Sequence, residues 1–161
     1  MGQTKWTAGF IAKCALIAAL YIALTGLFAP FGFAAVQVRI SEALCVLALF
    51  TPAAIFGLTT GCLISNLLWS TLGVLDVLFG TLATFLSVVC IYQLRRQNFF
   101  VAMAPDILFN AFLVSLTLML VAKEAYWLSV FCVGVGQAIA CYALGYPLYR
   151  LLDRYREKLP L

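Results

Sequence analysis

Long apolar runs with few charged residues are the feature that most restricts how this chain can fold. Of its 161 residues, 65% are hydrophobic and only 10% are charged, whereas soluble domains carry about 25% charged residues. A helix needs about 20 residues to cross the hydrocarbon layer of a bilayer, which is about 30 Å thick. We therefore expect an all-α integral membrane protein in which residues 1–161 form a single transmembrane domain.

The spans can be placed from the apolar runs and the residues that interrupt them. Lys5 precedes the first apolar run, which continues past the length of a signal peptide, so we interpret it as a retained first span. The run from Ala43 to Thr71 is long for one span and short for two, with Pro52 near its middle. Dividing this run gives six predicted spans, at about residues 8–29, 34–51, 52–71, 75–94, 104–122 and 126–149.

The distribution of basic residues decides between five and six spans. With six spans both termini lie on one side, together with Lys5, Lys13, Arg95, Arg96, Arg150, Arg154, Arg156 and Lys158. Arg39 and Lys123 lie opposite. Five spans would scatter the basic clusters over both faces, against the cytoplasmic bias of Lys and Arg. We therefore predict six spans with cytoplasmic termini, and we attribute the net charge of +4 to topology and contact with anionic membrane lipid, not with nucleic acid.

Several chemistries have no matching motif in the sequence. The six cysteines are scattered singly through apolar segments and the chain has no histidine, so we expect no disulfide framework, zinc site or haem site. The motifs of common membrane hydrolases are missing, and an enzyme is not expected. A phosphate-binding loop is also missing, so we expect no nucleotide cofactor in this chain, and ATP-driven transport would need partner ATPases.

Polar residues inside the predicted spans are the candidates for function, because polar groups in lipid need a partner, a cavity or a role. Four of them, Arg39, Glu42, Asn66 and Asp76, fall toward the outer side in the six-span arrangement. Arg39 and Glu42 are three residues apart, so they could simply form an ion pair on one helix face. Alternatively, Glu42 accepts two parallel hydrogen bonds from adjacent N–H groups of a ligand, while Arg39 positions its carboxylate.

The other polar candidates also have two interpretations each. Asp76 can stabilise the first turn of its helix or contact a ligand, and Asn66 can bond a neighbouring helix or a heterocycle. Gln137 is flanked by small residues and either joins helices or forms the floor of a site. Asn110 is similar but nearer the cytoplasmic side, and Trp69 belongs to an aromatic belt or stacks on a planar ligand.

Small residues recur every four positions on two predicted helices. Ala15, Ala19 and Ala23 form a smooth stripe on the first span, and Gly57 and Gly61 form a G-x-x-x-G pattern on the third. Such stripes let another helix approach closely. Internal packing is the default expectation for both stripes.

Four sequence motifs resemble those of the QueT family. They are Q-V-R-I-S-E-A-L at 37–44, G-C-L-I-S-N at 61–66, G-V-L-D-V-L-F-G-T-L-A-T at 73–84 and Y-A-L-G-Y-P-L near the C-terminus. Members of that family are the substrate-binding S components of energy-coupling-factor (ECF) importers. They are assigned to queuosine precursors, which are 7-deazaguanines.

The resemblance implies a six-helix S component in a bacterial plasma membrane, with its ligand held near the extracellular face. It also implies docking on a transmembrane coupling protein and two cytosolic ATPases. Ala15 and Ala19 match the A-x-x-x-A pattern that such S components use for this contact. The loaded S component would topple in the membrane and release its ligand inside.

One position departs from the family pattern. Relatives often carry glutamate where this chain has Gln137, and a cationic aminomethyl group would prefer a carboxylate. The glutamine therefore favours an uncharged precursor or a different 7-deazaguanine. Alternatively, the difference from glutamate has no effect on ligand choice. Two further hypotheses stay open: an S component for another vitamin-like heterocycle, and a helical membrane scaffold without a ligand.

Overall fold

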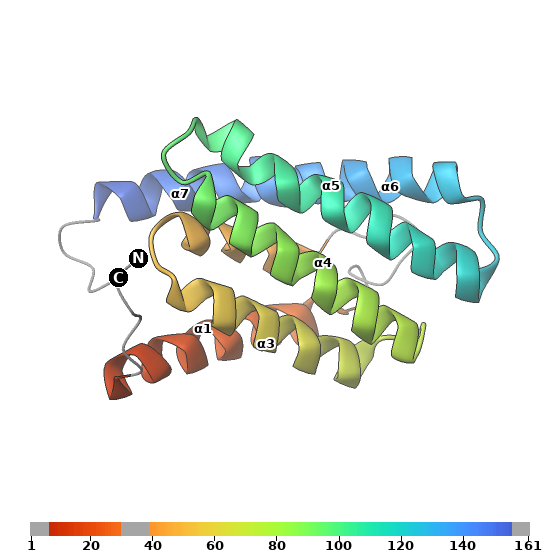
Figure 1. Cartoon of the computed structure of the whole chain (residues 1–161), viewed down its shortest axis with the longest axis horizontal. Helices are drawn as coiled ribbons and strands as arrows, with labels where there is room; N and C mark the ends of the chain where they lie inside the picture. Colours follow the sequence, from red (N-terminus) through yellow and green to blue (C-terminus); the bar gives the residue numbers. More distant parts are fainter. Residues whose placement is uncertain (1–6, 30–38, 156–161) are drawn as a thin grey trace.

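The computed structural model describes residues 7–29 and 39–155, and every regular element in this part of the chain is helical (Figure 1). The expected all-α fold is confirmed. Two elements are single α-helices, α1 (Ala8–Leu27) and α3 (Ala53–Trp69), and between them in the sequence lies the 3₁₀ helix η1 (Ile40–Leu49). The fourth, α4, covers Val74–Gln93.

The last two helical segments are composite. The first consists of α5 (Phe99–Thr117) and a π-helical turn, η2 (Leu118–Ala122). The second joins α6 (Tyr126–Ala138), the π-helical η3 (Ile139–Leu144) and α7 (Gly145–Arg154) into one helix of 29 residues. Successive segments run in alternating directions, so α1 begins at the end of the bundle where α7 finishes (Figure 1).

Four of these segments are long and apolar enough to cross a membrane, so the chain is a multi-pass membrane protein. They are Ala8–Leu27, Val74–Gln93, Phe99–Ala122 and Tyr126–Arg154. The helix α3 is shorter, and η1 is a 3₁₀ helix of ten residues, which covers about 20 Å at about 2.0 Å per residue. Six complete spans and cytoplasmic termini therefore stay predictions.

Two predicted segments differ from the observed helices. The second predicted span, 34–51, lies partly outside the described residues, and its described part is 3₁₀ helix instead of a full α-helical span. The fifth helix begins at Phe99 instead of near 104. The Asn98 side chain accepts a hydrogen bond from the Phe100 N–H (3.2 Å) and caps this earlier start, and the helix continues through Pro105.

The glycine stripe of α3 packs directly against α1. A Cβ atom added at Gly57 would lie 2.8 Å from the carbonyl oxygen of Cys14. One added at Gly61 would lie 2.9 Å from the Cβ of Tyr21. These contacts leave no room for a side chain, and the expectation of internal packing is confirmed for this stripe.

The alanine stripe of α1 behaves differently. Ala15, Ala19 and Ala23 are exposed, whereas Ile17 and Tyr21 on the other face of the helix are buried. The expectation of internal packing was therefore wrong for the alanines. They lie on a smooth outer face of the bundle, flanked by exposed leucines such as Leu16 and Leu20.

The 3₁₀ helix η1 lies in the core of the bundle. Its residues from Ser41 to Leu49 are all buried, and it contacts α1, α3, α4, α5, η3 and α7. Because residues three apart align in a 3₁₀ helix, Glu42 and Cys45 share one face of η1. The element therefore carries polar side chains into the centre of the fold.

Candidate functional site

Four charged side chains are almost completely buried in the described part of the chain. Arg39 is 4% exposed, and Glu42, Asp76 and Asp106 are 0% exposed. They come from the start of η1, from α4 and from α5. Burying ionised groups is costly unless they are paired and hydrogen-bonded, and inside a membrane such groups are by default a functional hypothesis.

Arg39, Asn66 and Asp76 form one group, which we call the Arg39 cluster. The Arg39 guanidinium forms an ion pair with the Asp76 carboxylate (Nη2–Oδ2 3.6 Å), and the Ser70 hydroxyl donates to the same carboxylate. The Asn66 amide nitrogen lies 3.5 Å from the Asp76 carbonyl oxygen. Side chains from the start of η1, from α3 and from α4 therefore meet in this cluster.

Two glycines shape this cluster. Gly73 has a φ of 73°, a conformation that glycine adopts without the steric cost of a side chain, and it places Asp76 in the first turn of α4. A Cβ added at Gly80 would lie 2.7 Å from the Asn66 amide nitrogen and within 4 Å of Asp76 and Arg39. Gly80 thus provides the space in which the three polar side chains converge.

The Arg39 cluster has two acceptor oxygens without a donor. Oδ1 of Asn66 and Oδ1 of Asp76 are buried and have no hydrogen-bond partner among the described residues. An unsatisfied buried polar group costs about 1–3 kcal/mol. Because Asn66 and Asp76 belong to the same cluster, these two acceptors suit a ligand that offers N–H donors.

Glu42 has partners that the sequence did not indicate. Its carboxylate accepts hydrogen bonds from the hydroxyl of Tyr21 on α1 and from the thiol of Cys45 (3.1 Å). The ion pair in this region joins Arg39 to Asp76, so the pairing of Arg39 with its sequence neighbour Glu42 is not the arrangement that forms. The backbone bond from the Glu42 N–H to the Arg39 carbonyl (3.0 Å) holds the two residues in the first turn of η1.

A second group surrounds Asp106, and we call it the Asp106 cluster. The Asp106 carboxylate accepts hydrogen bonds from the Gln137 amide (3.2 Å), the Cys141 thiol (2.9 Å) and the Asn110 amide (3.2 Å). The structure thus brings together Gln137 and Asn110, which the sequence suggested separately. Asp106 itself was missed, although a carboxylate within an apolar helix, four residues before an asparagine, was a signal that could have identified it.

The two clusters meet at η1. One carboxylate oxygen of Glu42, one of Asp106 and the sulfur of Cys45 all lie within 4.8 Å of one another. These oxygen and sulfur atoms could coordinate a metal ion or accept hydrogen bonds from a cationic group. A continuous buried polar region therefore runs from Asp76 through η1 to Asp106.

Trp69 lies apart from this polar region. Its ring packs on α1, where a Cβ added at Gly26 would lie 2.7 Å from a ring carbon. The side chain is partly buried. This contact closes the end of the α1–α3 pair, and stacking of Trp69 on a ligand stays a prediction.

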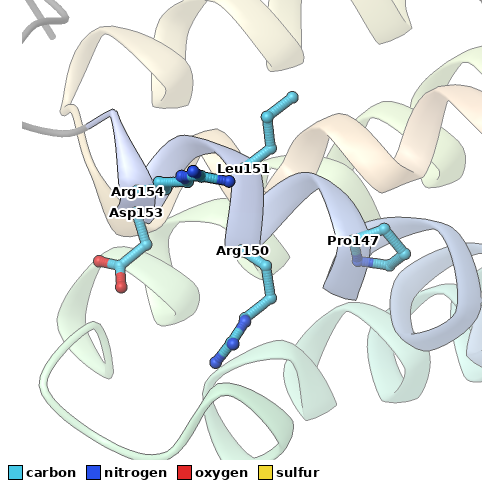
Figure 2. Close-up of a pocket in the computed structure, with 5 residues that line it drawn as sticks. All are labelled: Pro147, Arg150, Leu151, Asp153 and Arg154. Carbon is cyan, nitrogen blue, oxygen red and sulfur yellow. The ribbon is translucent and has the colours of Figure 1, made fainter.

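Two cavities lie at the end of the bundle where α7 finishes. One, of about 500 Å³, is lined by Pro147, Arg150, Leu151, Asp153 and Arg154, whose side chains project to different sides of α7 (Figure 2). The other, of about 470 Å³, is lined by Leu49, Phe50, Tyr92, Arg95, Arg96, Tyr149 and Asp153. Neither contains a predicted site residue. Their charged lining residues, Arg95, Arg96, Arg150, Asp153 and Arg154, belong to the basic end of the bundle.

Comparison with known proteins gives a specific result. The model of the QueT transporter family matches residues 11–154. The chain is 34% identical over 144 residues to the Queuosine precursor transporter QueT of Lactococcus lactis subsp. cremoris (strain MG1363), and the match covers 79% of this chain and 82% of that protein. No solved structure matches the chain.

Proposed function

Because the chain belongs to the QueT transporter family, we propose that it is the substrate-binding S component of an ATP-driven ECF importer for a queuosine precursor. It captures a 7-deazaguanine at the outer side of a bacterial plasma membrane. The observation that carries this proposal is the buried polar region, because ionisable side chains inside a membrane bundle are costly and by default mark a substrate or ion pathway.

In this proposal the Arg39 cluster binds the heterocycle of the ligand. A guanine-like edge offers adjacent N–H donors, and the unsatisfied oxygens of Asn66 and Asp76 are buried acceptors for them. Arg39 holds the Asp76 carboxylate in place through their ion pair. This proposal gives Asp76 the role that the sequence suggested for Glu42, because Oδ1 of Asp76 is a buried acceptor without a donor among the described residues.

The energy for import comes from partners in this proposal. The chain has no phosphate-binding loop, so two cytosolic ATPases and a transmembrane coupling protein supply the ATP-driven step. The exposed alanine stripe of α1 supports docking on the coupling protein, since small residues let a partner helix approach closely. The basic end of the bundle faces the cytoplasm, as the bias of Lys and Arg favours.

The direct test is ligand-induced thermal stabilisation of the purified chain. We expect 7-deazaguanines to raise the melting temperature, because a ligand at 100 times its Kd stabilises the folded state by about 2.7 kcal/mol. Guanine, riboflavin, biotin and thiamine are the comparison ligands. Stabilisation by one of the three vitamins alone would favour an S component for another heterocycle, and the absence of any shift would favour a scaffold without a ligand.

A second prediction concerns docking. Ala19→Leu adds bulk to the exposed stripe of α1, and we expect it to lower co-purification with the coupling protein and ATPases by at least about tenfold, which corresponds to about 1.4 kcal/mol. Binding of the 7-deazaguanine should stay unchanged, because Ala19 faces away from the polar region. Ala122→Leu is the matched control, since Ala122 is also exposed but lies at the end of η2. Equal behaviour of the two variants would contradict a docking role for the stripe.

A further inference from the structure

The described part of the chain buries more carboxyl groups than cationic side chains. Glu42, Asp76 and Asp106 are three buried carboxylates, and Arg39 is the buried cation beside them. If all four are ionised, two negative charges are in excess. Asp76 is paired with Arg39 (3.6 Å), whereas Glu42 and Asp106 accept hydrogen bonds from neutral donors, namely a hydroxyl, thiols and amides.

The spacing between Glu42 and Asp106 suits a single bridging donor. Their facing oxygens lie within 4.8 Å of each other. A hydrogen bond from an ammonium to a carboxylate is about 2.8 Å long, so one nitrogen placed between the two oxygens can donate to both. A protonated primary amine offers three donors and one positive charge, which matches both the geometry and the charge of this place.

A third acceptor belongs to the Asp106 cluster. The Asn110 amide nitrogen donates to the Asp106 carboxylate (3.2 Å) and to the Asp106 carbonyl oxygen (2.9 Å). The amide oxygen of Asn110 is buried and has no hydrogen-bond partner among the described residues, and the residue is only 2% exposed. The Asp106 cluster therefore has an unsatisfied acceptor for one further donor.

We propose that Glu42 and Asp106 bind a protonated amine on the substituent of the ligand, so that the chain selects an aminomethyl 7-deazaguanine over its cyano counterpart. This inference rests on the proposed function. It reverses the expectation drawn from Gln137. The glutamine does not leave the site neutral, because it donates to Asp106 (3.2 Å) and holds that carboxylate in place for the amine.

The test compares the affinity of the purified chain for 7-aminomethyl-7-deazaguanine and 7-cyano-7-deazaguanine. The two ligands share the heterocycle and differ in the cationic group, and we expect the aminomethyl form to bind roughly 10- to 100-fold more tightly. Equal affinities, or tighter binding of the cyano form, would overturn the inference and leave the proposed function standing. Failure of both ligands to bind would overturn the proposed function as well.

Variants test which residues cause the preference for the aminomethyl ligand. Asp106→Asn should reduce the preference for the amine to a few-fold while the cyano ligand still binds, which also shows that the variant is folded. Asp76→Asn is the matched control, because it removes a carboxylate from the Arg39 cluster and should weaken both ligands while their ratio is retained. Glu42→Gln provides a second variant should Asp106→Asn fail to fold. A preference that survives both Asp106→Asn and Glu42→Gln would overturn the assignment.

Discussion

Arg39→Met is expected to remove about 3–5 kcal/mol from the free energy of unfolding, the usual cost of breaking a buried ion pair by deleting one partner. The substitution keeps a long side chain, so the loss comes mainly from the charge. It leaves the Asp76 carboxylate buried without its cation, in a region that already holds Glu42 and Asp106. Chemical or thermal unfolding of the purified protein in detergent measures the effect.

A double variant separates charge imbalance from lost packing. In Arg39→Met with Asp76→Asn both ends of the ion pair are neutral, and we expect most of the lost stability to return, because replacing a whole buried pair is often close to neutral. Ligand binding should not return, since both residues belong to the Arg39 cluster. If Arg39→Met alone were as stable as the original chain, the ion pair would contribute little to the free energy of unfolding.

Gly57→Ala is expected to destabilise the bundle by about 1–3 kcal/mol, the typical cost of forcing extra atoms into a packed interface. The new methyl group would lie 2.8 Å from the backbone oxygen of Cys14 and 2.8 Å from the Cβ of Ile17. Neither is the free end of a flexible side chain, so α1 and α3 must move apart. Gly61→Ala, 2.9 Å from the Cβ of Tyr21, should act in the same direction.

Gly9→Ala on α1 is the matched control for these variants. A Cβ at Gly9 would meet nothing within 4 Å, and alanine favours the helix by up to about 1 kcal/mol over glycine. We therefore expect Gly9→Ala to be neutral or stabilising in the same unfolding measurement. If Gly57→Ala behaved like Gly9→Ala, the close approach of α1 and α3 would not be a determinant of stability.

The local features of the fold could be predicted from the sequence. Apolar runs and turn residues located α1, α3 and α4 to within about two residues at each end, which is the usual uncertainty of helix ends. The sequence of η1 carries no comparable signal for a 3₁₀ helix, because the same residues fit an α-helix. Its conformation depends on the helices that enclose it, and neighbours distant in sequence leave no local pattern.

The partners of the polar residues were harder to predict for the same reason. Spacing along the chain suggested Arg39 with Glu42, yet the ion pair joins Arg39 to Asp76, 37 positions away on another helix. Periodicity also could not distinguish the stripe of Ala15 and Ala19 from that of Gly57 and Gly61. Both stripes are smooth, and which face of α1 meets α3 is decided by packing across the bundle.

The central position of η1 has a consequence for how the protein is made. At about 20 Å, this helix is too short to cross the bilayer core as an independent segment, and part of its surface is covered by η3 and α7, which are synthesised last. The core around Glu42 can therefore close only after η3, which carries Cys141, has been synthesised. Chains that end before η3 should remain incompletely assembled and become substrates for membrane proteases.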